Sequence, residues 1–207
     1  MLLPFRSPDK PIPTTQEVVR KLPESSWLVQ PKYNGWRMLA FIDSPTEIRC
    51  LSRVGRPMED TGALFNPSIK DGFKEIKSHG HLLPAGTILD CEFIGPRGKL
   101  EPAIYIFDML AWNGDWLANE PFEQRFERCR DLFLPDQMFH VVTTIDQDFL
   151  GLYNKLKTDW EETGNTLHEG IVLKSRKGKL KLNRASCADS SAMLKLKYRD
   201  NDDRRRY

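Results

Sequence analysis

Residues 30–37 read Gln-Pro-Lys-Tyr-Asn-Gly-Trp-Arg and place a single lysine shortly before an Asn-Gly pair. Strand-like runs flank this pair, at 27–32 and at 36–43. An Asn-Gly pair between two such runs is the strongest short-range signal of a β-hairpin. A lysine in an apolar strand is costly to bury unless it is paired or functional. Lys32 is therefore either a surface residue of a hairpin or a residue with a chemical role.

The sequence outside this hairpin predicts an α+β fold. Apolar, β-branched runs predict further strands, and apolar residues spaced at the helical period predict helices. The predicted strands cover 47–52, 87–94, 103–110, 170–174 and 192–198, and the predicted helices cover 14–22, 67–78, 122–133 and 146–162. Because strands and helices do not alternate strictly, we expect antiparallel sheets flanked by helices.

We expect the whole chain, 1–207, to form a single domain, because no flexible linker interrupts residues 25–199. Within it we predict an extended lead-in at 1–13 and a basic tail at 200–207. Hydrophobic residues make up 40% of the chain, which is too many for a disordered protein. No run approaches the ~18 apolar residues of a membrane span. We therefore expect an intracellular, cytoplasmic protein without a membrane partner, and a monomer.

The charge is unevenly distributed along the chain. The net charge is +2, but residues 174–207 contain twelve Lys or Arg against four Asp or Glu, so this end carries +8 and the rest −6. Such an end indicates either a polyanion partner or a solvated charged surface with a frayed tail. The four cysteines are scattered and the four histidines form no cluster, which argues against a disulfide framework and a zinc site.

Charged residues stand within or directly before four of the predicted strands, among apolar residues. Besides Lys32, these residues are Glu92, Glu169, Lys195 and Lys197. Each strand alone could be half-buried, but together their charges predict one pocket with two acids for a divalent metal and three lysines for phosphates. In such a pocket a lysine amine can attack the α-phosphate of a nucleotide, with pyrophosphate leaving.

The order and spacing of these segments resemble the nucleotidyltransferase domain of ATP-dependent polynucleotide ligases, whose superfamily includes the mRNA capping enzymes. The family's motifs K-x-D-G-x-R, S-R, D-G-E, F-D-h-L, E-G-h-V-h-K and K-h-K are matched, in this order, at 32–37, 52–53, 90–92, 107–110, 169–174 and 195–197. The resemblance implies that family's ATP-grasp-like fold, the use of ATP and Mg²⁺, and a nucleic acid as partner.

The resemblance also implies roles for the residues that match. Lys32 would carry a covalent AMP. Phe107 would stack on the adenine, and the backbone near Gln30 would read the adenine edge. Arg37 and Glu92 would approach the ribose.

The remaining matched residues would handle phosphates and metal. Arg53 would hold the 5′-phosphate of the nucleic acid. Glu169 would bind the catalytic Mg²⁺, and Lys195 and Lys197 would hold the α-phosphate of ATP.

The sequence departs from the family pattern in three places. Asn34 stands where most members have Asp, which weakens a contact to metal or to a terminal hydroxyl and puts the final sealing step in doubt. Cys91 replaces the middle glycine of D-G-E, which a strand tolerates. Only ten residues follow Lys197, whereas family members continue into an OB-fold domain. We therefore expect either a truncated chain or a minimal ligase.

Sealing of nicked DNA is the favoured function, because the segments at 31–37 and 169–174 look most like those of DNA ligases. RNA joining stays open as an alternative. The spacing of the segments around 52–57 and 89–93 argues against a capping guanylyltransferase. The 31 residues before Lys32 leave no room for the extra module of NAD-dependent ligases. The chain could instead be a non-catalytic module that binds nicks or ends. An AMP adduct on the purified protein would support an enzyme over such a binding module.

Overall fold

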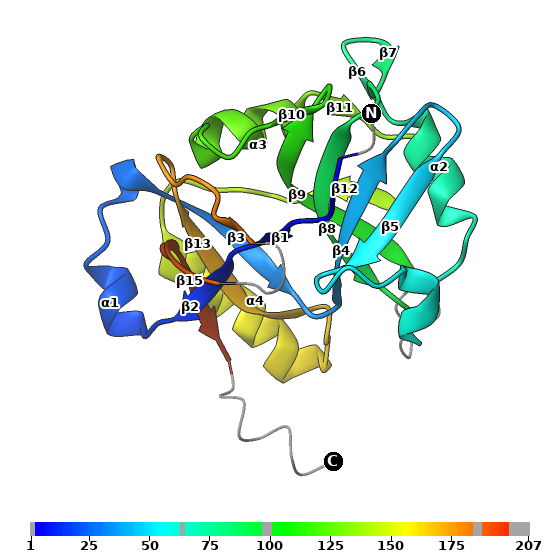
Figure 1. The fold of residues 1–207 in the computed structure, drawn as a ribbon. Helices are drawn as coiled ribbons and strands as arrows, with labels where there is room; N and C mark the ends of the chain where they lie inside the picture. The colour runs from blue at the N-terminus through cyan, green and yellow to red at the C-terminus, as the bar shows by residue number, and fades with distance from the viewer. Residues whose placement is uncertain (1–2, 63–64, 97–100, 184–187, 199–207) are drawn as a thin grey trace.

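Two sheets organise the computed structural model, which describes residues 3–62, 65–96, 101–183 and 188–198 (Figure 1). In this part of the chain the larger sheet has six strands. They are β5 (Ile48–Ser52), β4 (Trp36–Ile42), β8 (Thr87–Ile94), β9 (Ala103–Trp112) and β10 (Asp115–Trp116), with β12 (Phe139–Val141) also paired to β9. The second sheet has four strands, in the order β2 (Lys10–Pro13), β15 (Asp189–Lys197), β13 (His168–Ser175) and β3 (Trp27–Tyr33).

Smaller elements complete the fold around these sheets. The short strands are β1 (Ser7–Pro8) with β14 (Leu182–Asn183), and β11 (Leu132–Phe133) with β6 (Lys77–Ser78) and β7 (His81–Leu82). The helices are α1 (Gln16–Arg20), η1 (Glu24–Ser26), η2 (Met58–Thr61), α2 (Ile69–Glu75), α3 (Phe122–Arg130) and α4 (Phe149–Thr163). Helix α3 packs against β9, and α4 packs against β13 and β3.

Alternation along the strands separates the core from the cavity. In β13, Ile171 and Leu173 are fully buried in a cluster with Phe149 and Tyr153 of α4. Successive side chains of a strand point to opposite faces, so Val172 and its neighbours at even positions face away from α4. The second face of this sheet is thereby left for the site described below.

The expected α+β class is confirmed, with antiparallel pairs predominating and two parallel pairs, β2 with β15 and β9 with β12. Helix α1 begins where expected, because the Thr15 hydroxyl accepts a hydrogen bond from the Val18 N–H. The lead-in was predicted as extended, and residues 7–8 and 10–13 are the strands β1 and β2. The predicted tail, 200–207, lies outside the described residues. The cysteines Cys50, Cys91 and Cys129 are free and buried.

The predicted hairpin around Asn34 and Gly35 is wrong. Strand β3 pairs with β13, whereas β4 pairs with β5 and β8. The Asn34 N–H donates to Leu167 O at 2.9 Å, and the Gly35 N–H donates to Glu92 Oε1 at 3.0 Å. A Cβ at residue 35 would lie 2.3 Å from Phe93 O. The Asn-Gly turn therefore carries the chain from one sheet to the other, and glycine is needed there for close packing on β8.

A row of four rings joins the two sheets next to this turn. Tyr33 of β3 stacks on Tyr105 of β9 with ring centroids 3.8 Å apart, and Tyr105 stacks on His140 at 4.8 Å. On its other side Tyr33 contacts His168 at 4.9 Å. Aromatic contacts of this kind stabilise beyond simple burial, so the row holds the sheets together where the chain crosses.

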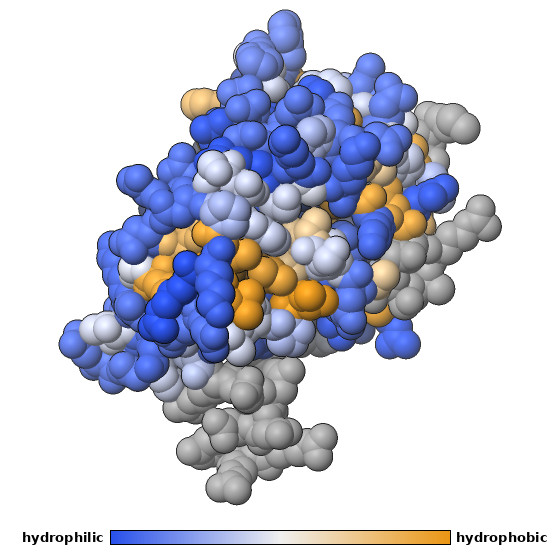
Figure 2. Space-filling view, turned by 90° about the vertical axis from the view of Figure 1, so that its left-hand side faces the viewer, coloured by the Kyte–Doolittle hydropathy of each residue, from blue (hydrophilic) through white to orange (hydrophobic). Residues whose placement is uncertain are grey.

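The face in Figure 2 is mostly hydrophilic, with a hydrophobic area near its centre and another toward its right edge. Within the described residues, no helix has the length and apolar character needed to cross a membrane.

Candidate active site

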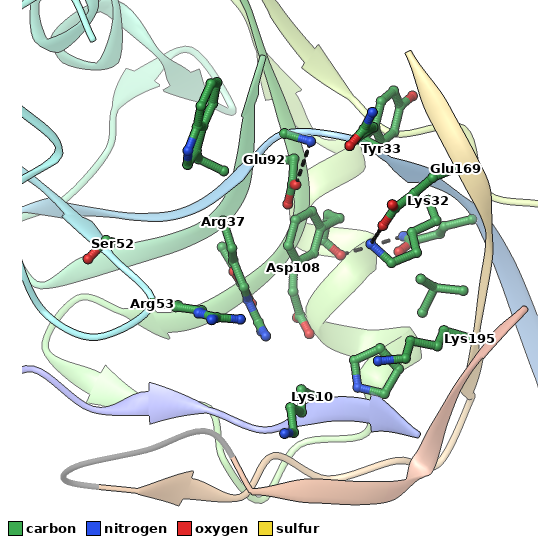
Figure 3. A pocket seen from close by; sticks show the side chains of 18 of the residues that line it. Lys10, Lys32, Tyr33, Arg37, Ser52, Arg53, Glu92, Asp108, Glu169 and Lys195 are labelled. Atoms are coloured by element: carbon green, nitrogen blue, oxygen red, sulfur yellow. Dashed lines mark hydrogen bonds and ion pairs between the residues drawn. The ribbon is translucent and has the colours of Figure 1, made fainter. Parts of the chain in front are cut away.

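A cavity of about 690 Å³ lies between the two large sheets (Figure 3). Its walls come from β3 and β4, from β8 and β9, and from β13, β15 and β2. All of the residues that the sequence assigned to a site line this cavity, namely Gln30, Lys32, Arg37, Arg53, Glu92, Phe107, Glu169, Lys195 and Lys197. The predicted convergence of charged strands on one pocket is therefore confirmed.

Lys32, Glu169 and Lys197 form the centre of the site. Glu169 Oε1 lies 2.5 Å from Lys32 Nζ and 3.0 Å from Lys197 Nζ, and the three side chains are 15–21% exposed. The register explains the contact, because Gly170 of β13 lies opposite Lys32 on one side and Lys197 on the other. Burial raises the pKa of Glu169, but the two lysines outweigh it and bring the pKa below the ordinary 4.5. Glu169 is therefore an anion that holds two cations in place.

Gly170 makes this close arrangement possible. Its φ of 145° is in a region that L-residues rarely adopt, and a Cβ there would lie 2.0 Å from Leu196 O. The register of β13 also shifts between residues 168 and 170. An irregularity of this kind re-aims a side chain, here that of Glu169, toward the cavity.

Glu92 is the second carboxylate at the site. It lies on β8 and accepts the Gly35 N–H, which ties it to the turn that follows Lys32. Burial raises its pKa to about 7, although the charge of Lys32 acts in the opposite direction. Near neutral pH Glu92 can therefore either donate or accept a proton.

Arg37 is held on the wall of the cavity by a carboxylate that the sequence analysis did not single out. Its Nε donates to Asp90 Oδ1 at 2.9 Å and its Nη2 to Asp90 Oδ2 at 2.5 Å. Its Nη1 donates to Asp9 O at 2.9 Å. The signal was present in the sequence, because Asp90 is a second acid in the apolar run that holds Glu92.

A buried lysine, Lys174, contacts both the backbone and the ring of Phe107. Lys174 Nζ donates to Phe107 O at 3.0 Å and lies 4.8 Å from the centre of the Phe107 ring and 4.3 Å from that of Phe122. Burial lowers the pKa of Lys174 to about 8. Gln30 Nε2 donates to Thr144 Oγ1 at 3.0 Å and also approaches Phe107 O. The predicted aromatic residue and Gln30 thus belong to the same part of the cavity.

Asn34 has a structural partner that an aspartate could not keep. Its Nδ2 donates to Thr166 O at 3.2 Å, in the loop that leads into β13. A carboxylate has no donor for this carbonyl. The amide therefore ties the turn after Lys32 to the segment that leads to Glu169.

Lys10, Arg53, Arg56 and Lys195 are further cations that line the cavity. Lys195 lies on the same face of β15 as Lys197, as its alternation predicts. Burial lowers the pKa of Lys195, and the charges of Lys32 and Lys10 lower it further. Sequence analysis missed Lys10, because no motif marks it and it reaches the site only through the parallel pairing of β2 with β15.

The donor set fits magnesium only together with a phosphate ligand. Within the described residues there is no group of three or more His, Cys, Asp or Glu side chains that could hold a metal ion. Glu169 and Glu92 are two carboxylates beside Lys32. Magnesium commonly binds through one or two carboxylates and substrate phosphates, so the cavity suits an ion that arrives with a triphosphate.

Residues 95–197 match the family described as the ATP dependent DNA ligase domain. No curated protein sequence matches the chain. Mycobacterial DNA ligase D complexed with ATP and MES superposes with a TM-score of 0.60 at 16% identity, over 96% of this chain and 61% of that one. A Lig E DNA ligase, described as binding DNA with a minimal scaffold, gives 0.55 at 16% identity, over 91% and 68%. An archaeal ATP-dependent RNA ligase gives 0.52 at 15% identity, over 84% and 46%.

The structural likeness shows a shared fold. The chain spans less than two thirds of the mycobacterial ligase and less than half of the archaeal ligase.

Proposed function

We propose that this chain is an ATP-dependent ligase that seals nicked DNA through a lysyl-AMP intermediate on Lys32, and its match to the ligase domain over 95–197 and its fold support this proposal. The observation that carries the proposal is the contact of Lys32 with Glu169 in a cavity that also holds Lys195, Lys197 and Phe107. A nucleophilic amine, phosphate-binding lysines and an aromatic ring are the parts that adenylate transfer needs.

In the first step the Nζ of Lys32 attacks the α-phosphorus of ATP. A nitrogen–phosphorus bond forms, the phosphorus–oxygen bond to the β-phosphate breaks, and pyrophosphate leaves. The ammonium loses one proton to water before the attack, and the Glu169 carboxylate, 2.5 Å away, orients the Lys32 amine. The second proton passes to water once the new bond has formed. Lys195 and Lys197 offset the charge that develops on the phosphate.

Phe107 and Gln30 would bind the base in this step. Phe107 offers an aromatic face at the cavity, and its backbone is held by Lys174. Arg37 is engaged by Asp90, so it would support the ribose side of the cavity mainly by position. Magnesium, held by Glu169 with Glu92 and the phosphates, would neutralise phosphoryl charge when bound.

In the later steps the AMP moves to the 5′-phosphate of the nick, and the 3′-hydroxyl then displaces it. Arg53, which lines the cavity, would hold the 5′-phosphate. RNA joining is the second candidate, because an archaeal RNA ligase shares the fold. A matched pair of nicked duplexes, one all DNA and one with RNA at the nick, distinguishes the two.

Labelling with α-labelled ATP and magnesium tests the proposal. The wild-type chain should acquire one AMP, and Lys32→Ala should acquire none. Lys32→Arg should also fail, because a guanidinium stays protonated and cannot attack. Lys155→Ala is the matched control, since Lys155 is exposed on α4 away from the cavity lining. Persistent absence of label on the wild type would favour a non-catalytic nick-binding module, and equal labelling of Lys32→Ala would exclude Lys32 as the nucleophile.

A further inference from the structure

The N-terminal strap, defined as residues 3–13, runs from the larger sheet to the second sheet (Figure 1), and its residues Lys10 and Pro11 line the cavity. At its start Arg49 Nη2 donates to Leu3 O at 3.2 Å, and Ser7 Oγ donates to Arg53 O at 3.0 Å. At its end the strap is β2, which pairs in parallel with β15. The Lys10 N–H donates to Ala188 O at 2.8 Å. The strap is therefore part of the wall of the cavity.

A contact to the active site fixes the position of Lys10 within this wall. Arg37, which Asp90 holds from the other side, donates to the carbonyl of Asp9. Asp9 is fully buried, so the backbone just before Lys10 has little freedom. Lys10 and Pro11 line the cavity, and Figure 3 shows Lys10 on the same side of it as Lys195.

The lining of the cavity has more cations than acids, with eight Lys or Arg against five Asp or Glu. Glu169 is engaged by two lysines and Asp90 by Arg37. Among the described residues, no acid lies within 4 Å of the charged groups of Lys195 and Arg53. Charges packed in this way favour an anion as ligand.

The ion pair of Lys10 does not compensate this excess. Lys10 Nζ lies 3.5 Å from Asp189 Oδ1, but the two side chains are 47% and 65% exposed. Exposed pairs contribute little and exchange readily for another anion.

The lysines form a sequence from the nucleophile outward. Figure 3 shows the amine of Lys195 between those of Lys32 and Lys10, and all three residues line the cavity. In an in-line displacement the leaving group points away from the nucleophile. With the α-phosphate between Lys32 and Lys195, the β- and γ-phosphates would extend toward Lys10.

We propose that Lys10 binds the β- and γ-phosphates of ATP and the outgoing pyrophosphate. The proposal rests on the adenylation of Lys32 described above and adds a residue outside the matched motifs. Lys10 could instead bind the 5′-phosphate of a nick. The experiment therefore separates binding of ATP and pyrophosphate from binding of a nick.

The first measurement is the rate of lysyl-AMP formation across an ATP series, and of its reversal across a pyrophosphate series. Lys10→Ala should raise the concentration needed for half-maximal rate of either ligand by roughly tenfold to a hundredfold, as expected for loss of a charge-assisted hydrogen bond. Lys10→Arg should restore most of the affinity. Sealing of a pre-adenylated nick should stay near the wild-type rate.

Asp189→Ala is the matched control, because it removes the ion pair of Lys10 and keeps the lysine. It should bind ATP as well as the wild type or better. If Asp189→Ala reproduces the loss seen in Lys10→Ala, Lys10 acts only by holding the strap, and the proposal is wrong. It is also wrong if Lys10→Ala leaves both concentration series unchanged, or if it weakens only the binding of a 5′-phosphorylated nick.

Calorimetric titration of pyrophosphate into Lys32→Ala, with and without Lys10→Ala, keeps the two proposals distinguishable. This titration needs no covalent chemistry. Weaker binding in the double variant supports the role of Lys10 even if Lys32 is not the nucleophile, and equal binding overturns it even if Lys32 is labelled.

Discussion

Replacing Glu169 by glutamine should destabilise the fold and abolish most adenylation. The carboxylate accepts from Lys32 at 2.5 Å and from Lys197 at 3.0 Å, and all three side chains are mostly buried. An amide of the same size removes the negative charge that the two ammonium groups share. Each charge-assisted hydrogen bond is worth ~1.5–3 kcal/mol. Because the lysines can still reach some water, we expect a loss of about 2–4 kcal/mol in the free energy of unfolding.

The pH dependence of this loss gives a sharper test. The pKa of Glu169 in the folded protein is lowered from 4.5, since the lysines outweigh burial. A lowered folded-state pKa contributes stability that is fully present above the unfolded-state pKa and is lost as the pH falls through the folded-state pKa. The difference between wild type and Glu169→Gln should therefore be complete at pH 7 and should shrink as the pH falls below about 4.5.

Urea unfolding at a series of pH values measures this difference. Glu161→Gln is the control, because Glu161 pairs with Lys157 at 3.4 Å with side chains 38–52% exposed, and it should change stability by less than ~0.5 kcal/mol. A Glu169→Gln protein as stable as the wild type at pH 7, or an equal loss at every pH, would refute the assigned charge balance. In the labelling assay the variant should lose about a hundredfold or more in rate, as when a group that stabilises a transition state is removed.

Three further predictions concern the base, the turn and the tail. Phe107→Ala should raise the ATP concentration needed for labelling with little effect on folding, by the roughly 1–3 kcal/mol of a lost stacking contact; an unchanged ATP titration would move the adenine elsewhere. Gly35→Ala should prevent stable folding or cost more than ~3 kcal/mol, because its Cβ would lie 2.3 Å from Phe93 O, and a melting temperature equal to the wild type would contradict that contact. Alanine at residues 204–206, which lie outside the described part of the chain, should flatten a salt dependence of nick binding that we expect at a log–log slope of roughly −3 to −5, while labelling by ATP stays unchanged; an identical slope would mean that the tail is a passive end.

Most individual strands and helices could be predicted from local patterns. Alternation along 193–197 places Lys195 and Lys197 on one face, and the structure has both lining the cavity. An acid inside an apolar run also indicated a site residue, because burying a charge without a partner is energetically costly. This is why Glu92 and Glu169 could be chosen before their partners were known.

The pairing of strands could not be predicted in the same way. Asn34 and Gly35 have the local signature of a hairpin, yet their polar groups bond to Leu167, Thr166 and Glu92, which are distant in the sequence. A turn signal reports what the backbone can adopt and not which strand lies beside it.

By itself, the sequence determined the α+β class and the kinds of side chain available for nucleotide chemistry, because propensity and alternation are local properties. Only the tertiary structure decided that Glu169 lies between Lys32 and Lys197, that Arg37 forms an ion pair with Asp90, and that Lys10 lines the cavity. These contacts depend on the register of β13 and on the parallel pairing of β2 with β15. Register and pairing are set by packing between segments far apart in the chain, and no local pattern contains that information.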